Sequence, residues 1–241
     1  QHTSASVGKS LVSYVTGHAI CEGYISGIDH KLNDWELLEN TLFYDQNLIN
    51  LLNMAAGHHK YADHNIKTGG QYPTNSNKNT IAFHMKDGVF ENSKKSKSKY
   101  QYTNLLTSIV INYVWHKSDG NFQNLLDKVF KEKEKIENDV WFEKNNNKTV
   151  RQENRNNKIK KEYEVKDEDG PITYSFKATR YDYLRIAKAI LDDWQNDTCV
   201  GKYLKTVFNN KVNKNYQGNV DNNSNWFNPK QYAGFFHTGY T

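Results

Sequence analysis

A serine and a lysine at the start of one apolar-striped segment constrain the fold of this chain most. Ser6 and Lys9 lie three positions apart. The apolar residues around them recur every four positions: Val7, Leu11, Val15 and Ala19. This spacing predicts a helix from about Ser6 to Ile20, with the serine in its first turn. Residues three apart lie on one face of a helix, so the lysine amine can take the proton of the serine hydroxyl.

Two further short motifs follow in a fixed order. Tyr102-Thr103-Asn104 lies in the middle of the chain, which has 16 tyrosines and no other Tyr-x-Asn. His237-Thr238-Gly239 lies at the end. A serine and a lysine three apart also occur by chance, as in Ser96-Lys97-Ser98-Lys99. Order and separation therefore carry the argument for a serine acyl-transfer site, and the simpler alternative makes Ser4 or Ser6 a helix N-cap.

With these three motifs the chain resembles the serine β-lactamase and penicillin-binding protein superfamily. The resemblance is to its class C-like branch, with family VIII esterases, D-aminopeptidases and 6-aminohexanoate-oligomer hydrolases. It extends over nearly the whole chain, and segments 19–25 and 48–57 are similar to a helix end and a short helix of that branch.

The resemblance implies an α/β (α+β) fold in which a sheet region packs on a helical lobe, with the site in the cleft between them. Residues 1–241 would form a single β-lactamase-like catalytic domain that is mostly the helical part. Relatives have sheet strands beyond both ends, so we expect the chain to be the middle of a longer protein. The resemblance also favours a periplasmic or secreted protein.

The expected activity is that of a serine hydrolase that forms an acyl-enzyme on Ser6. Lys9 and Tyr102 would share the removal of the hydroxyl proton, and they are also left as the deacylating bases. A free lysine or tyrosine titrates near pH 10, so burial or a neighbouring charge must tune them. Asn104 would orient a substrate amide or the lysine.

The third motif and its neighbour complete the expected site. By resemblance, the N–H groups of Ser6 and Tyr240 would hold the oxyanion. Gly239 would let the substrate approach the strand, next to Thr238. Penicillin-recognising relatives usually carry lysine where this chain has His237, and histidine is mostly neutral at pH 7. This difference favours an ester or an amide substrate over a β-lactam or a peptide C-terminus.

Composition limits the other classes of function. The chain has 32 Lys and Arg against 27 Asp and Glu, and its basic residues are spread among acids and asparagines, which argues against nucleic acid as a partner. The sequence contains no run of about twenty apolar residues, so it predicts no membrane span. A single disulfide between Cys21 and Cys199 is possible, but nothing in the sequence supports it. We expect a small-molecule ester, amide or peptide substrate and no cofactor.

Several other segments have simpler interpretations. His58, His59, Asp63 and His64 could hold a metal in principle, but a solvated loop is the preferred interpretation and no metal site is predicted. Residues 105–114 predict a buried helix that carries Tyr102 and Asn104 at its start. Residues 131–169 predict surface structure with an apolar anchor at 140–142. Thr179 and Asp182 predict a capping box on a core helix.

Three alternatives stay open at this point. The first is a true β-lactamase or D,D-peptidase. The second is a non-catalytic binding or structural protein that keeps the fold. The third is a plain helical domain in which the motifs coincide by accident, and in that case Ser6, Lys9, Tyr102 and His237 would lie far apart.

Overall fold

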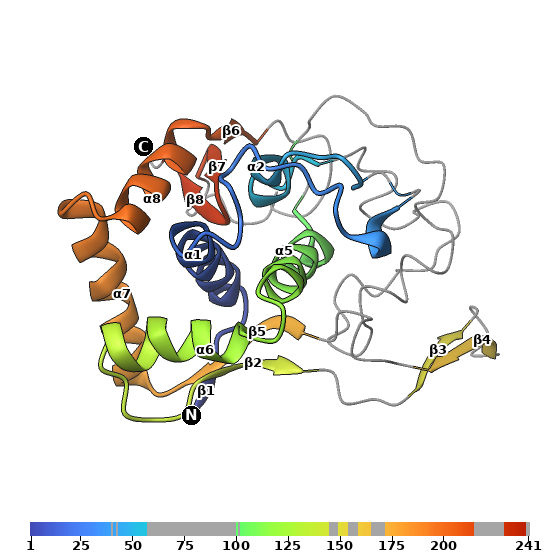
Figure 1. Cartoon of the computed structure of the whole chain (residues 1–241), viewed down its shortest axis with the longest axis horizontal. Coiled ribbons are helices and arrows are strands. Elements are labelled where there is room, and N and C mark those ends of the chain that lie inside the picture. Colours follow the sequence, from blue (N-terminus) through green and yellow to red (C-terminus); the bar gives the residue numbers. More distant parts are fainter. Residues whose placement is uncertain are drawn as a thin grey trace.

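The computed structural model describes residues 1–39, 41, 43–56, 100, 102–144, 149–153, 159–164, 172–214 and 229–239. Within these ranges the chain combines helices with three small antiparallel sheets (Figure 1). This agrees with the expected mixture of helix and sheet.

The sheet next to the N-terminus has the strand order β1-β5-β2. Its strands are β1 (His2–Thr3), β5 (Ile172–Ala178) and β2 (Trp141–Lys144). Both outer strands run antiparallel to β5, with His2 opposite Ala178 and Trp141 opposite Lys177. Phe142 is buried and packs edge-on against Phe176 of β5, with ring centroids 5.0 Å apart. The predicted apolar anchor at 140–142 is therefore confirmed for Val140 and Phe142, which are buried, but not for Trp141, which is 40% exposed.

Two helices, α1 (Val7–Cys21) and α5 (Asn104–Lys117), pack against each other and against β5 (Figure 1). The predicted helices over about 6–20 and 105–114 are thus confirmed. Gly8 permits the close approach of α1, since a Cβ at this position would lie 2.0 Å from the backbone oxygen of Tyr174. Asn112 joins α5 to the sheet, because its amide donates to the Ile172 carbonyl (2.6 Å) and accepts from the Ile172 N–H (3.0 Å).

The helices α7 (Arg180–Gln195) and α8 (Cys199–Asn209) pack together, and α8 also packs on α1. The predicted capping box of Thr179 and Asp182 is confirmed at the start of α7. The expectation that α7 is a core helix is wrong in part. Ile186 is buried, but Leu184 and Leu191 are 66% and 52% exposed, because only one side of α7 faces the protein.

Two tertiary links hold the far end of α1 to these helices. Cys21 and Cys199 form a disulfide, which settles the pairing that the sequence left open. Asp193 is buried and accepts hydrogen bonds from Tyr14 (2.7 Å), Lys133 (2.5 Å) and Thr198 (2.7 Å). These three donors compensate the buried carboxylate for the loss of water. Asp193, near the end of α7, thereby connects α7 to α1, to Lys133 and to the start of α8.

A second sheet lies on the other side of α1 and has the order β6-β7-β8. Its strands are β6 (Val212–Asn213), β7 (Gln231–Ala233) and β8 (Phe236–Thr238). The short helix α2 (Leu48–Leu52) contacts its turn, because the Phe235 N–H donates to the Leu52 carbonyl at 2.9 Å. Of the segment 48–57 that resembles a short helix, only the first part is helical: α2 ends at Leu52, with Asn53 as its C-cap.

The remaining described elements are short. A 3-10 turn spans Glu36–Leu38, and α6 (Phe122–Asp127) continues into a π-helical turn at Lys128–Lys133. The strands β3 (Thr149–Glu153) and β4 (Ile159–Glu164) form an antiparallel hairpin. In the part of the chain that the structure describes, no helix is long and apolar enough to cross a membrane.

Candidate active site

The structure brings together side chains of the three sequence motifs at the start of α1. Lys9 Nζ lies 3.4 Å from Ser6 Oγ. The same amine lies 4.9 Å from the centroid of the Tyr102 ring, and that ring stacks on His237 with centroids 5.9 Å apart. More than two hundred residues separate Ser6 from His237 in the sequence. An accidental set of motifs on a plain helical domain predicts that these groups lie far apart, and they do not.

Lys9 is the buried member of this group. The side chain is 1% exposed, although it carries an ammonium group when protonated. Burial penalises the charged form and lowers the pKa of Lys9 from 10.5 to about 7. A large fraction of the amine is therefore neutral near pH 7 and can accept a proton, which an ordinary solvent-exposed lysine cannot do.

Ser6 is exposed, so its hydroxyl is open to a substrate. It occupies the N-cap position of α1, but its side chain makes no capping hydrogen bond. Ser4 makes none either: its hydroxyl oxygen accepts from the Phe176 N–H at 2.9 Å and ties the chain to β5. Ser6 is therefore the N-cap of α1 by position, as the simpler alternative expects, but neither serine caps the helix through its side chain. The hydroxyl of Ser6 has Lys9 as its polar neighbour instead.

The backbone around Ser6 turns sharply into the helix. The N–H groups of Val7, Gly8 and Lys9 each donate to the carbonyl three residues earlier. Ala5, just before the serine, has a φ of +46°, a conformation that costs free energy in any residue with a Cβ. Within the described residues the Ser6 N–H has no acceptor, and it lies at the positive end of the helix dipole. This N–H could donate to an oxyanion, which is the role that the sequence analysis expects of it.

Two aromatic residues from the second sheet surround Tyr102. Tyr232 on β7 meets both Tyr102 and His237 edge-on, with centroid distances of 6.1 Å and 5.0 Å. Tyr232 is 1% exposed, so its buried ring packs firmly against the rings of Tyr102 and His237. Rigid packing of this kind holds catalytic groups in one geometry.

Tyr174 on β5 belongs to the site and was not predicted. Lys9 Nζ lies 3.8 Å from the centroid of its ring, closer than to the Tyr102 ring. Burial, and then the charge of Tyr102, raise the pKa of Tyr174, so this phenol stays neutral. The run Ile172-Thr173-Tyr174-Ser175-Phe176 is rich in strand-forming residues and could have been recognised as a strand, but no pattern in it points to Lys9.

The turn between β7 and β8 carries His237 to the site. Gly234 and Phe235 have φ values of +53° and +67°, as a tight turn with two left-handed residues requires. A Cβ on Gly234 would lie 2.1 Å from a methyl group of Val207. The Phe235 carbonyl accepts from the Ser10 hydroxyl at 3.0 Å, one turn after Ser6. The hairpin is thus anchored directly to the helix that carries Ser6 and Lys9.

For the other predicted site residues the structure shows mainly the position in the fold. Asn104 is the first residue of α5, directly after its N-cap Thr103. The Thr238 hydroxyl oxygen is buried without a hydrogen-bond partner within the described residues. Gly239 has a φ of +73° and ends the strand. Tyr240 lies outside the described residues.

The described ranges hold no group of three or more His, Cys, Asp or Glu side chains arranged to bind a metal. The histidines and aspartate considered for a metal, at positions 58, 59, 63 and 64, lie outside these ranges. The serine-lysine decoy at 96–99 lies outside them as well.

No protein-family model matches the chain, and no curated protein matches it. The argument for function therefore depends on the residues and their geometry.

Proposed function

We propose that the chain is a serine hydrolase that cleaves an ester or amide through an acyl-enzyme on Ser6, in a β-lactamase-like catalytic domain. One observation carries the proposal: a buried lysine whose pKa is lowered to about 7 lies 3.4 Å from the oxygen of an exposed serine. Burying a lysine amine is costly, and a group with a strongly perturbed pKa beside a nucleophile is typical of an active site.

In the first step Ser6 Oγ attacks the substrate carbonyl carbon. The hydroxyl proton passes to the neutral Lys9 amine, and negative charge develops on the carbonyl oxygen beside the Ser6 N–H. When the tetrahedral intermediate collapses, the bond to the leaving alcohol or amine breaks. The leaving group takes the proton from Lys9, with Tyr102 as a partner in the transfer, and the acyl group stays on Ser6.

In the second step water hydrolyses the acyl-enzyme. The regenerated Lys9 amine, with Tyr102, takes a proton from water while the water oxygen attacks the acyl carbon. Collapse of this intermediate breaks the bond to Ser6 Oγ and returns the proton to the serine. The acid is released, and no group beyond water is consumed.

The histidine at position 237 favours a substrate that carries no charge. It stacks on Tyr102, and a histidine does not carry the permanent positive charge with which a lysine would bind a carboxylate. We therefore propose an ester or amide without a required carboxylate. Hydrolysis of a short-chain aryl ester compared with a chromogenic cephalosporin separates this substrate class from a β-lactamase or D,D-peptidase.

The test measures aryl-ester hydrolysis by the full chain and three variants. Ser6→Ala and Lys9→Met are expected to abolish steady-state turnover of the ester, because they remove the nucleophile and its base. Ser10→Ala is the matched control on the same helix: it removes one bond to the Phe235 carbonyl, but the Phe235 N–H still donates to the Leu52 carbonyl, so the variant is expected to keep most of the activity. Steady-state turnover that survives at the wild-type rate in Ser6→Ala would contradict the proposal, and a folded wild-type chain without turnover would favour a binding protein.

A further inference from the structure

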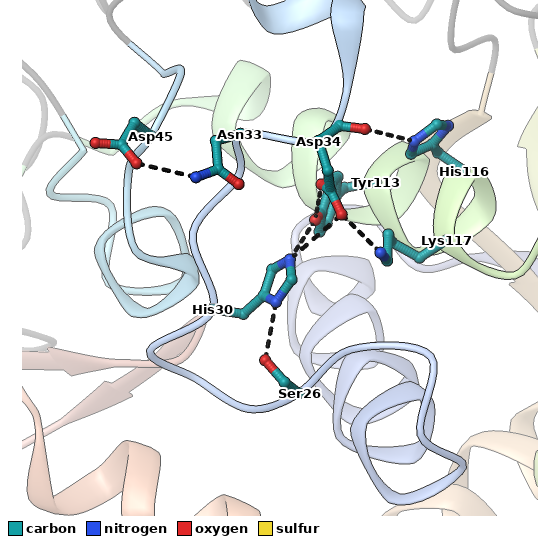
Figure 2. Close-up of polar contacts among 8 residues, drawn as sticks. All are labelled: Ser26, His30, Asn33, Asp34, Asp45, Tyr113, His116 and Lys117. Carbon is teal, nitrogen blue, oxygen red and sulfur yellow. Dashed lines mark hydrogen bonds and ion pairs between the residues drawn. The ribbon is translucent and has the colours of Figure 1, made fainter.

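A second serine is hydrogen-bonded to a histidine at a place that the proposed function does not use. Ser26 Oγ lies 2.9 Å from His30 Nδ1, and His30 Nε2 lies 2.6 Å from the Tyr113 hydroxyl oxygen (Figure 2). The Tyr113 hydroxyl in turn donates to Asp34 Oδ1 at 2.5 Å. Lys117 donates to the other oxygen of Asp34 at 2.7 Å. No sequence motif marks this polar turn.

The direction of each hydrogen bond follows from the carboxylate at the end of the chain of contacts. Burial alone would raise the pKa of Asp34, but the hydrogen bonds from Lys117 and Tyr113 hold it below its usual range. An ionised carboxylate only accepts, so Tyr113 donates its proton to Asp34. Burial, and then the hydrogen bond to Asp34, raise the pKa of Tyr113, so the phenol keeps that proton.

These directions fix the tautomer of the imidazole. The Tyr113 oxygen already gives its proton to Asp34, so it accepts from His30 and Nε2 carries the hydrogen. His30 Nδ1 is then unprotonated and accepts the proton of Ser26. A nucleophile, a base and a third group that orients the base are the parts of a hydrolase triad, which is recognised by geometry and not by sequence order.

The fold holds the base rigidly and leaves the serine open. Tyr113 is fully buried on α5, whereas Ser26 is exposed in the turn that follows α1. The backbone of His30 is fixed by two hydrogen bonds, from its N–H to the Gly27 carbonyl (3.2 Å) and from the Leu48 N–H to its carbonyl (2.8 Å). Ser26 comes after the end of α1 opposite to Ser6, and a helix of 15 residues is about 22 Å long. The two serines are therefore separate sites.

We propose that Ser26 is a second activated nucleophile, with His30 as its general base and Tyr113 and Asp34 as positioning residues, and that it accepts the acyl group of small activated esters. Ser26 Oγ bonds to the acyl carbon, its proton moves to His30 Nδ1, and the ester oxygen leaves with its electron pair. The imidazolium that forms lies 3.8 Å from Asp34 Oδ2, which stabilises its charge.

The experiment uses the full chain with Ser6→Ala, so it does not depend on the proposed function of Ser6. The protein is treated with p-nitrophenyl acetate, and acetylation of Ser26 is followed by peptide mass spectrometry. Adding His30→Gln is expected to slow this acetylation by about a hundredfold or more, the usual contribution of a general base. His116→Gln is the matched control. The His116 ring contacts the backbone carbonyl of Asp34 and not its carboxylate, so this variant is expected to leave the rate unchanged.

A second variant keeps the test decisive if His30→Gln disturbs folding. Tyr113→Phe retains the buried ring and removes only the hydroxyl that fixes the tautomer, so it is expected to slow acetylation of Ser26 while the far-ultraviolet circular dichroism is retained. Absence of acetyl groups on Ser26 in the Ser6→Ala protein would overturn the proposal. An unchanged rate in both His30→Gln and Tyr113→Phe would also overturn it.

Discussion

Replacement of Lys9 by methionine is expected to stabilise the protein while it abolishes hydrolysis. Lys9 is 1% exposed, and burial lowers its pKa from 10.5 to about 7. At about 1.4 kcal/mol for each pH unit, holding a proton on this amine in the folded state costs about 5 kcal/mol. The lost hydrogen bond to Ser6 and the lost contact with the Tyr174 ring offset about 2 kcal/mol of this gain. We expect Lys9→Met to raise the free energy of unfolding near pH 7 by about 3 kcal/mol.

The dependence of this difference on pH identifies its cause. Between pH 7 and 10.5 the unfolded chain binds one more proton at Lys9 than the folded chain, so wild-type stability rises with pH across this window and is lost as the pH falls through it. Lys9→Met lacks this contribution. The advantage of the variant is therefore expected to shrink as the pH rises towards 10.5, because other groups titrate equally in both proteins.

Urea unfolding of the two proteins at several pH values between 7 and 10.5 measures the difference. Ser10→Ala is the matched control on the same helix, and its stability is expected to run parallel to wild type over this range. If Lys9→Met were less stable than wild type at pH 7, or if the difference did not change with pH, the description of Lys9 as a buried, costly base would be refuted.

Three further predictions concern the elements that hold the site. The double variant Cys21→Ser and Cys199→Ser is expected to lose up to about 5 kcal/mol of stability in urea unfolding, because the bridge closes a loop of 178 residues. Gly8→Ala is expected to lower the thermal midpoint and the esterase rate together, because its Cβ would lie 2.0 Å from a carbonyl oxygen of β5. Asn112→Ala is expected to cost about 2–4 kcal/mol in urea unfolding, because it leaves two buried backbone groups of Ile172 unpaired. Unchanged unfolding curves would contradict each of these roles.

The helices could be predicted from the sequence because their signals are local. The four-residue spacing that begins at Val7 gave α1, and the paired Thr179 and Asp182 gave the capped start of α7. The exposure of Leu184 could not be predicted in this way. An apolar residue on a helix shows which face could be buried, but the partner that would bury it is set by the tertiary structure.

The candidate site was predictable only in part for the same reason. The spacing of Ser6 and Lys9 placed the amine beside the hydroxyl, and the structure agrees. The buried Lys9 amine contacts the ring of Tyr174, which lies more than 160 residues further along the chain on a strand that no motif marks. Local patterns do not report such long-range contacts.

The polar side chains around Ser26 show a further limit of prediction from the sequence. Ser26, His30 and Asp34 come from the segment after α1, and Tyr113 and Lys117 come from α5. The direction of their hydrogen bonds depends on the ionised state of Asp34. Spacing in the sequence contains neither the contact between these segments nor the tautomer of His30.

Mass spectrometry of the protein after treatment with a fluorophosphonate tests the central claim most directly. An activated serine displaces fluoride from the probe, so we predict a covalent adduct that peptide mapping assigns to Ser6, that is absent from Ser6→Ala at that position, and that is retained in Ser10→Ala. The rate of adduct formation is expected to fall in Lys9→Met. No adduct on Ser6 in the folded wild-type protein, or an equal rate in Lys9→Met, would contradict the assignment of Ser6 and Lys9 as nucleophile and base.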